Sequence, residues 1–121
     1  MSYRSDVAIA IDIADKEKFE TAITDYDSKL EDGCSYTAHD FLHEADEYRI
    51  SGNYILIYWS YVKWYSRFPE VFFFNNAMVA SYGIKRDLLR IGEDIRDVEE
   101  DYLINSGAFM PFVSQSIEFN C

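Results

Sequence analysis

The chain has 121 residues and is 49% hydrophobic, so it is long enough to bury a core without metal or disulfide support and too apolar for wholesale disorder. Eleven basic and 22 acidic residues give a formal net charge of −11, which repels phosphate backbones and disfavours direct nucleic-acid binding. Solubility alone can also account for such acidity.

Cysteine content and the N-terminus indicate the compartment. Cys34 and Cys121 lie far apart, which is not the pattern of a disulfide framework. The first apolar run is interrupted by Asp12 and is too short for a signal peptide, and no stretch approaches the length of a membrane span. We therefore expect a single domain over residues 1–121, in a reducing cytoplasm, with no membrane contact and no cofactor.

The first predicted elements are a strand and a helix. Isoleucine or valine alternates with smaller or polar residues in DVAIAIDI, at Val7, Ile9, Ile11 and Ile13. This period of two predicts a strand with one buried face. Asp15 is a candidate N-cap, and apolar residues then recur at helical spacing until Gly33, so we expect an amphipathic helix over residues 15–32.

The middle of the chain is less regular. Residues 34–50 give mixed signals, and residues 51–53 (SGN) have turn chemistry. The next stretch, YILIYWSYVKWY, is rich in strand formers and apolar on both faces around residues 55–59, so both faces should be covered there. Pro69 then fits the start of a helix that ends at Gly83.

The last predicted elements are strands in DLLRIGED and in PFVSQSIEF. The full order is strand, helix, strand, strand, helix, strand, with an added C-terminal strand. This order predicts an α+β fold of the ferredoxin-like split βαβ type. We expect a four-stranded antiparallel sheet with the helices at residues 15–32 and 69–82 on one face, plus the extra strand.

Three blocks carry a resemblance to a known group of proteins. The segments YRSDVAIAI, IYWSYVKWYSRFPEV and LRIGEDIRDVE resemble small acidic proteins of tailed bacteriophages whose function is unknown. The resemblance implies a viral context and no catalytic residues. The chain departs from the group in VFFFNNAM, where the group has charged residues on a helix surface, so it has extra apolar surface there.

One pair of residues has the spacing of metal ligands. His39 and His43 would point the same way on a helix, with Asp40 and Glu44 beside them. A hydrolytic H-E-x-x-H motif is absent, and two histidines need at least a third ligand. We therefore predict no metal site, and a metal-dependent enzyme using these histidines is the weakest alternative.

An acidic run, EDIRDVEED, suggests a surface for a partner. Its six carboxylates belong to Glu93, Asp94, Asp97, Glu99, Glu100 and Asp101. Carboxylates along an exposed turn can replace DNA phosphates in the groove of a nuclease or repressor. Residues 25–47 form a second acidic zone, with eight acids against Lys29. Both zones are consistent with a DNA mimic, although charge runs are also commonly just solvated.

The aromatic residues are concentrated in one block. Residues 54–74 contain ten of the chain's 21 aromatic residues. A base-stacking platform is disfavoured because Lys63 and Arg67 are the only nearby cations. A helix that begins at Pro69 cannot turn three successive phenylalanines inward, so we expect Phe72 or Phe73, with neighbouring Tyr65, to contact a partner.

These patterns together favour a non-enzymatic protein that binds and inhibits a host protein, such as a defence complex, in the host cytoplasm. The acidic surface and the aromatic anchors would make the contact. A self-associating phage accessory protein, with a homodimer closed by the phenylalanine patch, is the alternative.

Overall fold

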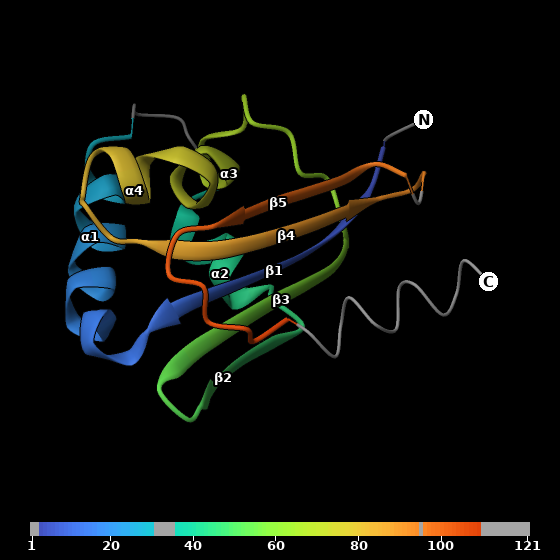
Figure 1. Ribbon diagram of the computed structural model, residues 1–121. Coiled ribbons are helices and arrows are strands. Elements are labelled where there is room, and N and C mark those ends of the chain that lie inside the picture. Colours follow the sequence, from blue (N-terminus) through green and yellow to red (C-terminus); the bar gives the residue numbers. More distant parts are fainter. Residues whose placement is uncertain (1–2, 31–35, 95, 110–121) are drawn as a thin grey trace.

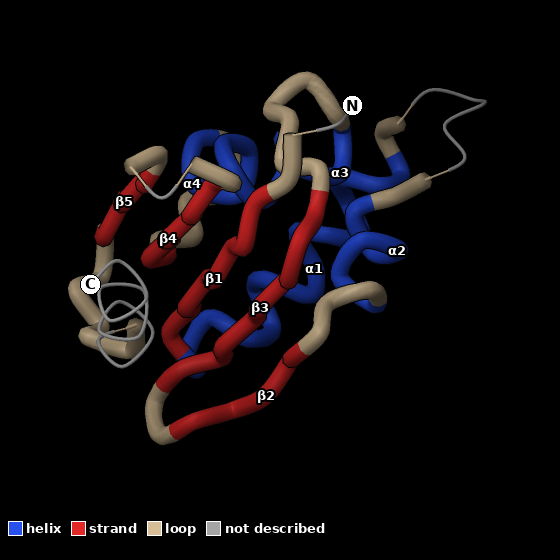
Figure 2. The backbone as a smooth tube through the Cα atoms, turned by 90° about the vertical axis from the view of Figure 1, so that its right-hand side faces the viewer, coloured by secondary structure: helices blue, strands red, loops and turns tan. Residues whose placement is uncertain are grey.

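The computed structural model describes residues 3–30, 36–94 and 96–109, and five strands within them form one antiparallel sheet. The strands are β1 (Ser5–Asp12), β2 (Glu47–Ser51), β3 (Tyr54–Val62), β4 (Arg86–Gly92) and β5 (Val98–Tyr102). Their order across the sheet is β2-β3-β1-β4-β5, so β2 and β5 form its two edges (Figure 1; Figure 2).

The fifth strand of the described residues was not predicted. The second half of the acidic run forms β5, which pairs with β4, and is not an exposed turn. The three acidic residues in the middle of β5 interrupt the alternation of apolar and polar residues by which a strand is recognised in a sequence. The predicted final strand, residues 111–119, lies outside the described residues.

One helix lies near its predicted place, and a second, short helix was not predicted because residues 34–50 give mixed signals. Helix α1 spans Lys16–Ser28 after a 3-10 turn (η1) at Ile13–Asp15, and the short helix α2 spans Ala38–His43. Asp15 lies at the N-cap position of α1 as predicted, but its side chain makes no capping hydrogen bond. Asp12 caps the 3-10 turn instead by accepting from the Ala14 N–H at 2.9 Å, because the chain turns before the α-helix begins.

The region from Pro69 is helical but not uniform. It consists of α3 (Pro69–Phe72), a π-helical turn η2 (Phe73–Ala77) and α4 (Met78–Ala80). It ends at Ala80, and a short turn leads to Gly83, whose φ of 66° is the left-handed conformation that glycine tolerates after helix ends. The predicted start at Pro69 is confirmed, and the helical region ends two residues before the predicted residue 82.

The core has two parts. The larger cluster joins β1, β3 and β4 to α1, α2 and the region of residues 69–80; it includes Ile9, Phe19, Phe41, Trp59 and Phe74. A smaller cluster lies on the other face of β1 and includes Ala8, Ala10, Leu89 and Phe109. Strand β1 is therefore buried on both faces, not on one as its alternation predicts, because it is the central strand of the sheet.

The helical region buries two of its three successive phenylalanines and leaves one at the surface. Phe73 and Phe74 are both fully buried, while Phe72 is 42% exposed. The wider π-helical turn leaves backbone carbonyls without helical partners, and Arg86 of β4 donates from Nε to the Phe74 carbonyl at 3.2 Å and from Nη2 to the Asn75 carbonyl at 2.8 Å. Arg86 therefore completes the hydrogen bonding of this turn.

None of the helices within the described ranges is long and apolar enough to cross a lipid bilayer.

Candidate functional site

The six predicted partner-binding carboxylates of residues 93–101, which we call the acidic ribbon, lie in and just before β5. Arg90 of β4 joins two of them, with 2.8 Å from Nη2 to Asp97 Oδ1 and 2.9 Å from Nε to Glu99 Oε1. The Tyr3 hydroxyl donates to Asp97 at 2.6 Å. Hydrogen bonds from Arg90 and then Tyr3 lower the pKa of Asp97 to about 2, so this carboxylate is charged as part of the fold.

The other members of the acidic ribbon also have partners within the chain. Asp101 pairs with Arg86, and Asp94 pairs with Arg96. Glu93 accepts a hydrogen bond from the Arg4 backbone N–H at 3.1 Å. Glu100 interacts with Tyr102, whose pKa is raised mainly by burial and further by the charge of Glu100 and its hydrogen bond. The acidic ribbon thus holds β5 and the N-terminal segment against β4.

Gly92 is the glycine of the RIGED block, and its role is close packing. A Cβ atom at this position would collide with the Tyr3 hydroxyl and with the Asp97 carboxylate. Its backbone N–H also donates to the Asp97 carbonyl at 2.8 Å. The glycine therefore permits the Tyr3–Asp97 contact at the point where the chain turns toward β5.

The predicted aromatic anchors separate into exposed and buried residues. Phe72 is exposed, as is Asn76 on the same side of the helical region. Phe73 is fully buried against Phe19 and Tyr26, which corrects its expected place at an interface: its ring lies on the side of the helical region that packs on α1. Tyr65 is half-buried, and its hydroxyl accepts from the Tyr3 backbone N–H at 2.8 Å.

Phe68, which the sequence analysis did not select, connects the anchors to a pocket. Its ring lies 5.1 Å from that of Tyr65, and its carbonyl accepts from the Phe72 N–H one helical turn later. The Arg67 guanidinium stacks over the rings of Tyr65 and Phe68 at 5.1 and 5.5 Å. We call Tyr65, Phe68 and Phe72 the aromatic surface.

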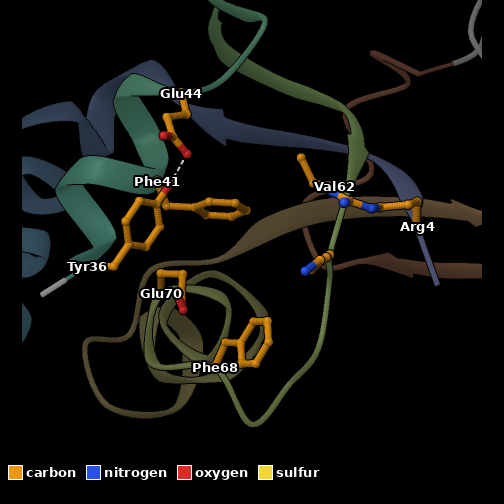
Figure 3. A pocket seen from close by; sticks show the side chains of 8 residues that line it. Arg4, Tyr36, Phe41, Glu44, Val62, Phe68 and Glu70 are labelled. Carbon is orange, nitrogen blue, oxygen red and sulfur yellow. Dashed lines mark hydrogen bonds between the residues drawn. The ribbon is translucent and has the colours of Figure 1, made fainter. Parts of the chain in front are cut away.

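The pocket beside Phe68 has a volume of about 400 Å³, enough for one side chain or a small molecule. The lining residues are Arg4, Tyr36, Phe41, Glu44, Val62, Lys63, Phe68 and Glu70. Figure 3 shows Tyr36, Phe41 and Glu44 on the α2 side, Phe68 and Glu70 at the start of α3, and Arg4 with Val62 opposite. It therefore has aromatic walls with acidic groups on one side and basic groups on the other.

The two carboxylates of the pocket differ in their partners. Glu44 accepts a hydrogen bond from the Tyr36 hydroxyl (Figure 3). The pKa of Tyr36 is raised mainly by burial and secondly by this hydrogen bond. Glu70 is only 8% exposed, and burial raises the pKa of its carboxyl, partly offset by its own backbone N–H. Among the described residues, no other side chain forms a hydrogen bond or ion pair with it.

Burial alone does not set Glu70 apart, as Asp87 shows. Asp87 is the most buried carboxylate, and it accepts from the backbone N–H groups of Ile104, Asn105 and Ser106 and from the Ser106 hydroxyl, at 2.6 to 3.1 Å. Asp87 is thus fully used to hold the segment after β5. Glu70 has no such set of donors and lines a pocket instead.

The histidine pair has a structural role in the described chain. The His39 ring lies 3.2 Å from Asp27 of α1, and it stacks on His43 with ring centroids 6.3 Å apart. Thr37 and Asp40 form a reciprocal capping box at the start of α2. No group of three metal-ligating side chains is found among residues 3–30, 36–94 and 96–109.

Glu70 and Tyr3, like Phe68, are residues that sequence reasoning missed. A glutamate after proline in a first helical turn is ordinarily a solvated residue that favours the helix dipole. Its burial depends on α2, which is distant in sequence. Comparison with known proteins adds no assignment: no protein-family model matches the chain, and no curated protein or solved structure matches it significantly.

Proposed function

We propose that the chain is a non-enzymatic, phage-type protein that binds and inhibits a host protein in the host cytoplasm. The resemblance of three sequence blocks to small acidic phage proteins supports the viral context. The net charge of −11 supports a partner with a basic surface, because opposite charge steers association.

The observation that carries this proposal is the position of Phe72. Its ring is 42% exposed at a cost in free energy of about 1 kcal/mol relative to burial, and it follows Phe68 by one helical turn. Phe68 lines the pocket that contains Glu70. An exposed aromatic ring one helical turn from a residue that lines a concave pocket is consistent with an interface hot spot.

We place the contact at the aromatic surface and not at the acidic ribbon. A DNA mimic needs carboxylates that are free to replace phosphates, whereas each carboxylate of the acidic ribbon has a partner in the chain. Arg86, Arg90 and Arg96 also offset part of its charge. DNA mimicry is a narrower version of the proposal, in which the negative charge of the acidic ribbon steers the approach of the partner protein.

Substitution of Phe72 tests the proposal. Phe72→Glu should leave the thermal midpoint within a few degrees, because the ring lies outside both core clusters, and should abolish partner capture from lysates of candidate bacterial hosts. Tyr48→Glu is the matched control, since Tyr48 of β2 is 43% exposed. Unfolding of Phe72→Glu, or capture unchanged relative to wild type, would contradict the proposed role of the ring.

A self-associating phage accessory protein is the second candidate, because an exposed ring beside a pocket can also contact a copy of the chain. Sedimentation equilibrium separates the two candidates. A wild-type dimer that becomes monomeric in Phe72→Glu, with no captured protein, would favour self-association. A wild-type monomer with Phe72-dependent capture would favour the host-protein inhibitor.

We also propose that the fold is the ferredoxin-like split βαβ arrangement with β5 added beside β4. The order β2-β3-β1-β4 supports this assignment, since in that arrangement the first and third strands are central neighbours. The single core cluster shared by α1 and the region of residues 69–80 supports the placement of both helices on one face.

A further inference from the structure

The pocket beside Glu70 has features that specify the chemistry of its ligand. Glu70 is more than nine-tenths buried, it lines the pocket, and no arginine, lysine or histidine among the described residues forms an ion pair with it. A buried carboxylate is stabilised by a cation that also donates hydrogen bonds. The pocket therefore favours a positively charged donor at this carboxylate.

The walls narrow the choice of cation. Phe41 and Phe68 present aromatic rings to the pocket, and a planar guanidinium stacks on rings while donating to a carboxylate in its own plane. The chain shows this chemistry with its own Arg67, which stacks over Phe68 at 5.5 Å. An ammonium group has no plane with which to stack, so the walls favour arginine over lysine.

The opposite side of the pocket adds a second requirement. Arg4 and Lys63 line it, and neither takes part in a side-chain ion pair within the described residues. These groups repel a second cation and favour a carboxylate. A ligand that fits both sides has a guanidinium at one end and a carboxylate at the other, within about 400 Å³.

We propose that this pocket receives an arginine side chain of the partner protein, with the guanidinium against Glu70 between the aromatic walls and a neighbouring carboxylate of the partner toward Arg4 and Lys63. The inference rests on the proposed function, because it names the group by which the bound protein is held. It makes Glu70 a recognition residue, and Phe68 belongs both to the pocket and to the aromatic surface.

The test uses the isolated full chain and a small probe, N-acetyl-L-arginine, which has a guanidinium and a carboxylate but no ammonium group. Two-dimensional NMR of the labelled protein should show saturable shifts at Phe41, Glu44 and Glu70 and at the Trp64 indole N–H. Trp64 is a reporter because its ring lies 5.9 Å from that of Phe41. A single side chain should bind with a Kd of about 1 mM.

Matched probes and variants decide the outcome. N-acetyl-citrulline has the same shape without the charge and should bind at least tenfold more weakly. Glu70→Gln should reduce binding of N-acetyl-arginine by at least tenfold, while Glu47→Gln, an exposed change of the same charge on β2, should not. The Glu70→Gln variant should fold, because the substitution removes a charge whose burial costs free energy. N-acetyl-lysine should bind more weakly than N-acetyl-arginine.

Three results would overturn the arginine proposal. N-acetyl-citrulline could bind as tightly as N-acetyl-arginine, N-acetyl-arginine could bind Glu70→Gln as tightly as wild type, or the NMR shifts could be confined to residues outside the pocket. Failure of the two proposals can be distinguished. Phe72-dependent capture without probe binding would overturn the pocket assignment and leave the proposed function standing. Probe binding that Glu70→Gln removes, without any captured protein or dimer, would support the pocket and contradict the proposed function.

Discussion

The acidic ribbon and the pocket of Glu70 use the same side-chain chemistry in opposite ways. The acidic ribbon contains six carboxylates within nine residues, and each of them hydrogen-bonds or pairs within the chain. The pocket contains a buried glutamate with no such partner among the described side chains. Partners in the fold, more than the number of acids, decide which carboxylates are available to a ligand.

The same contrast appears in the pKa values. Hydrogen bonds from Arg90 and Tyr3 lower the pKa of Asp97 to about 2, whereas burial raises the pKa of Glu70. The first carboxylate stabilises the folded state when it is charged, and the second costs free energy when it is charged. A cation supplied by a ligand would relieve that cost at Glu70.

The largest effect on stability is expected at the junction between the acidic ribbon and the π-helical turn. Arg86→Met should lower the free energy of unfolding by about 3 kcal/mol, because it leaves two backbone carbonyls and Asp101 without their donor. Urea denaturation measures this loss. The matched control is Arg96→Met, since the Arg96 side chain is 89% exposed beside Asp94 and should cost less than about 0.5 kcal/mol.

Equal losses for Arg86→Met and Arg96→Met would mean that the acidic ribbon is held by general charge balance. The proposed hydrogen-bonding role of Arg86 would then be wrong.

A smaller, pH-dependent effect is expected at Asp97. Its folded pKa of about 2 lies below its ordinary value of 3.8, so its contribution to stability is fully present above about pH 4 and is lost as the pH falls toward 2. Asp97→Asn should therefore be less stable than wild type at pH 6, and most of this difference should disappear as the pH falls to 2. Urea denaturation across this range measures the difference.

Asp15→Asn is the control for Asp97→Asn, because the Asp15 side chain makes no capping hydrogen bond. A deficit in Asp97→Asn that persists unchanged at pH 2 would show that the pairing with Arg90 does not stabilise the fold.

The smallest effect on stability is expected from reversing outer charges of the acidic ribbon. Changing Glu93, Asp94 and Glu100 to lysine should slow association with the captured partner by several-fold, more than it speeds dissociation, and high salt should remove the difference. Asp97 is left intact because it is bound to Arg90 and Tyr3. Surface plasmon resonance measures both rates.

A control triple, Asp15, Glu17 and Glu20 to lysine, changes the net charge by the same amount. An equal effect of both triples on association would assign steering to net charge alone. Salt-independent binding that neither triple alters would remove DNA mimicry from consideration.

The sequence predicts the parts of this fold that depend on local periodicity. The strand at residues 5–12, the turn after Ser51 and the helical region from Pro69 to Ala80 follow from alternation, turn chemistry and proline and glycine positions. The exposure of Phe72 follows from helical geometry in the same way. Each of these features needs only residues that are close in sequence.

Features that depend on distant partners could not be predicted. Strand β5 exists because Arg86 and Arg90 of the neighbouring strand accommodate its acidic residues. Phe73 is buried because its ring packs on Phe19 and Tyr26 of α1, and Arg86 of β4 satisfies two carbonyls of the π-helical turn. Glu70 forms part of a pocket only because α2 packs against the start of α3, which no spacing in the sequence indicates.

NMR titration of the side-chain carboxyl carbons of Asp97 and Glu70 tests the central claim most directly, since it reads the two environments in the unmodified chain. The account predicts that Asp97 titrates well below the ordinary range of aspartate and Glu70 above that of glutamate, because Arg90 and Tyr3 stabilise one charge and burial disfavours the other. The pKa of Glu70 should fall when N-acetyl-arginine is added. A Glu70 carboxyl that titrates at or below its ordinary pKa and does not respond to the probe would contradict the account.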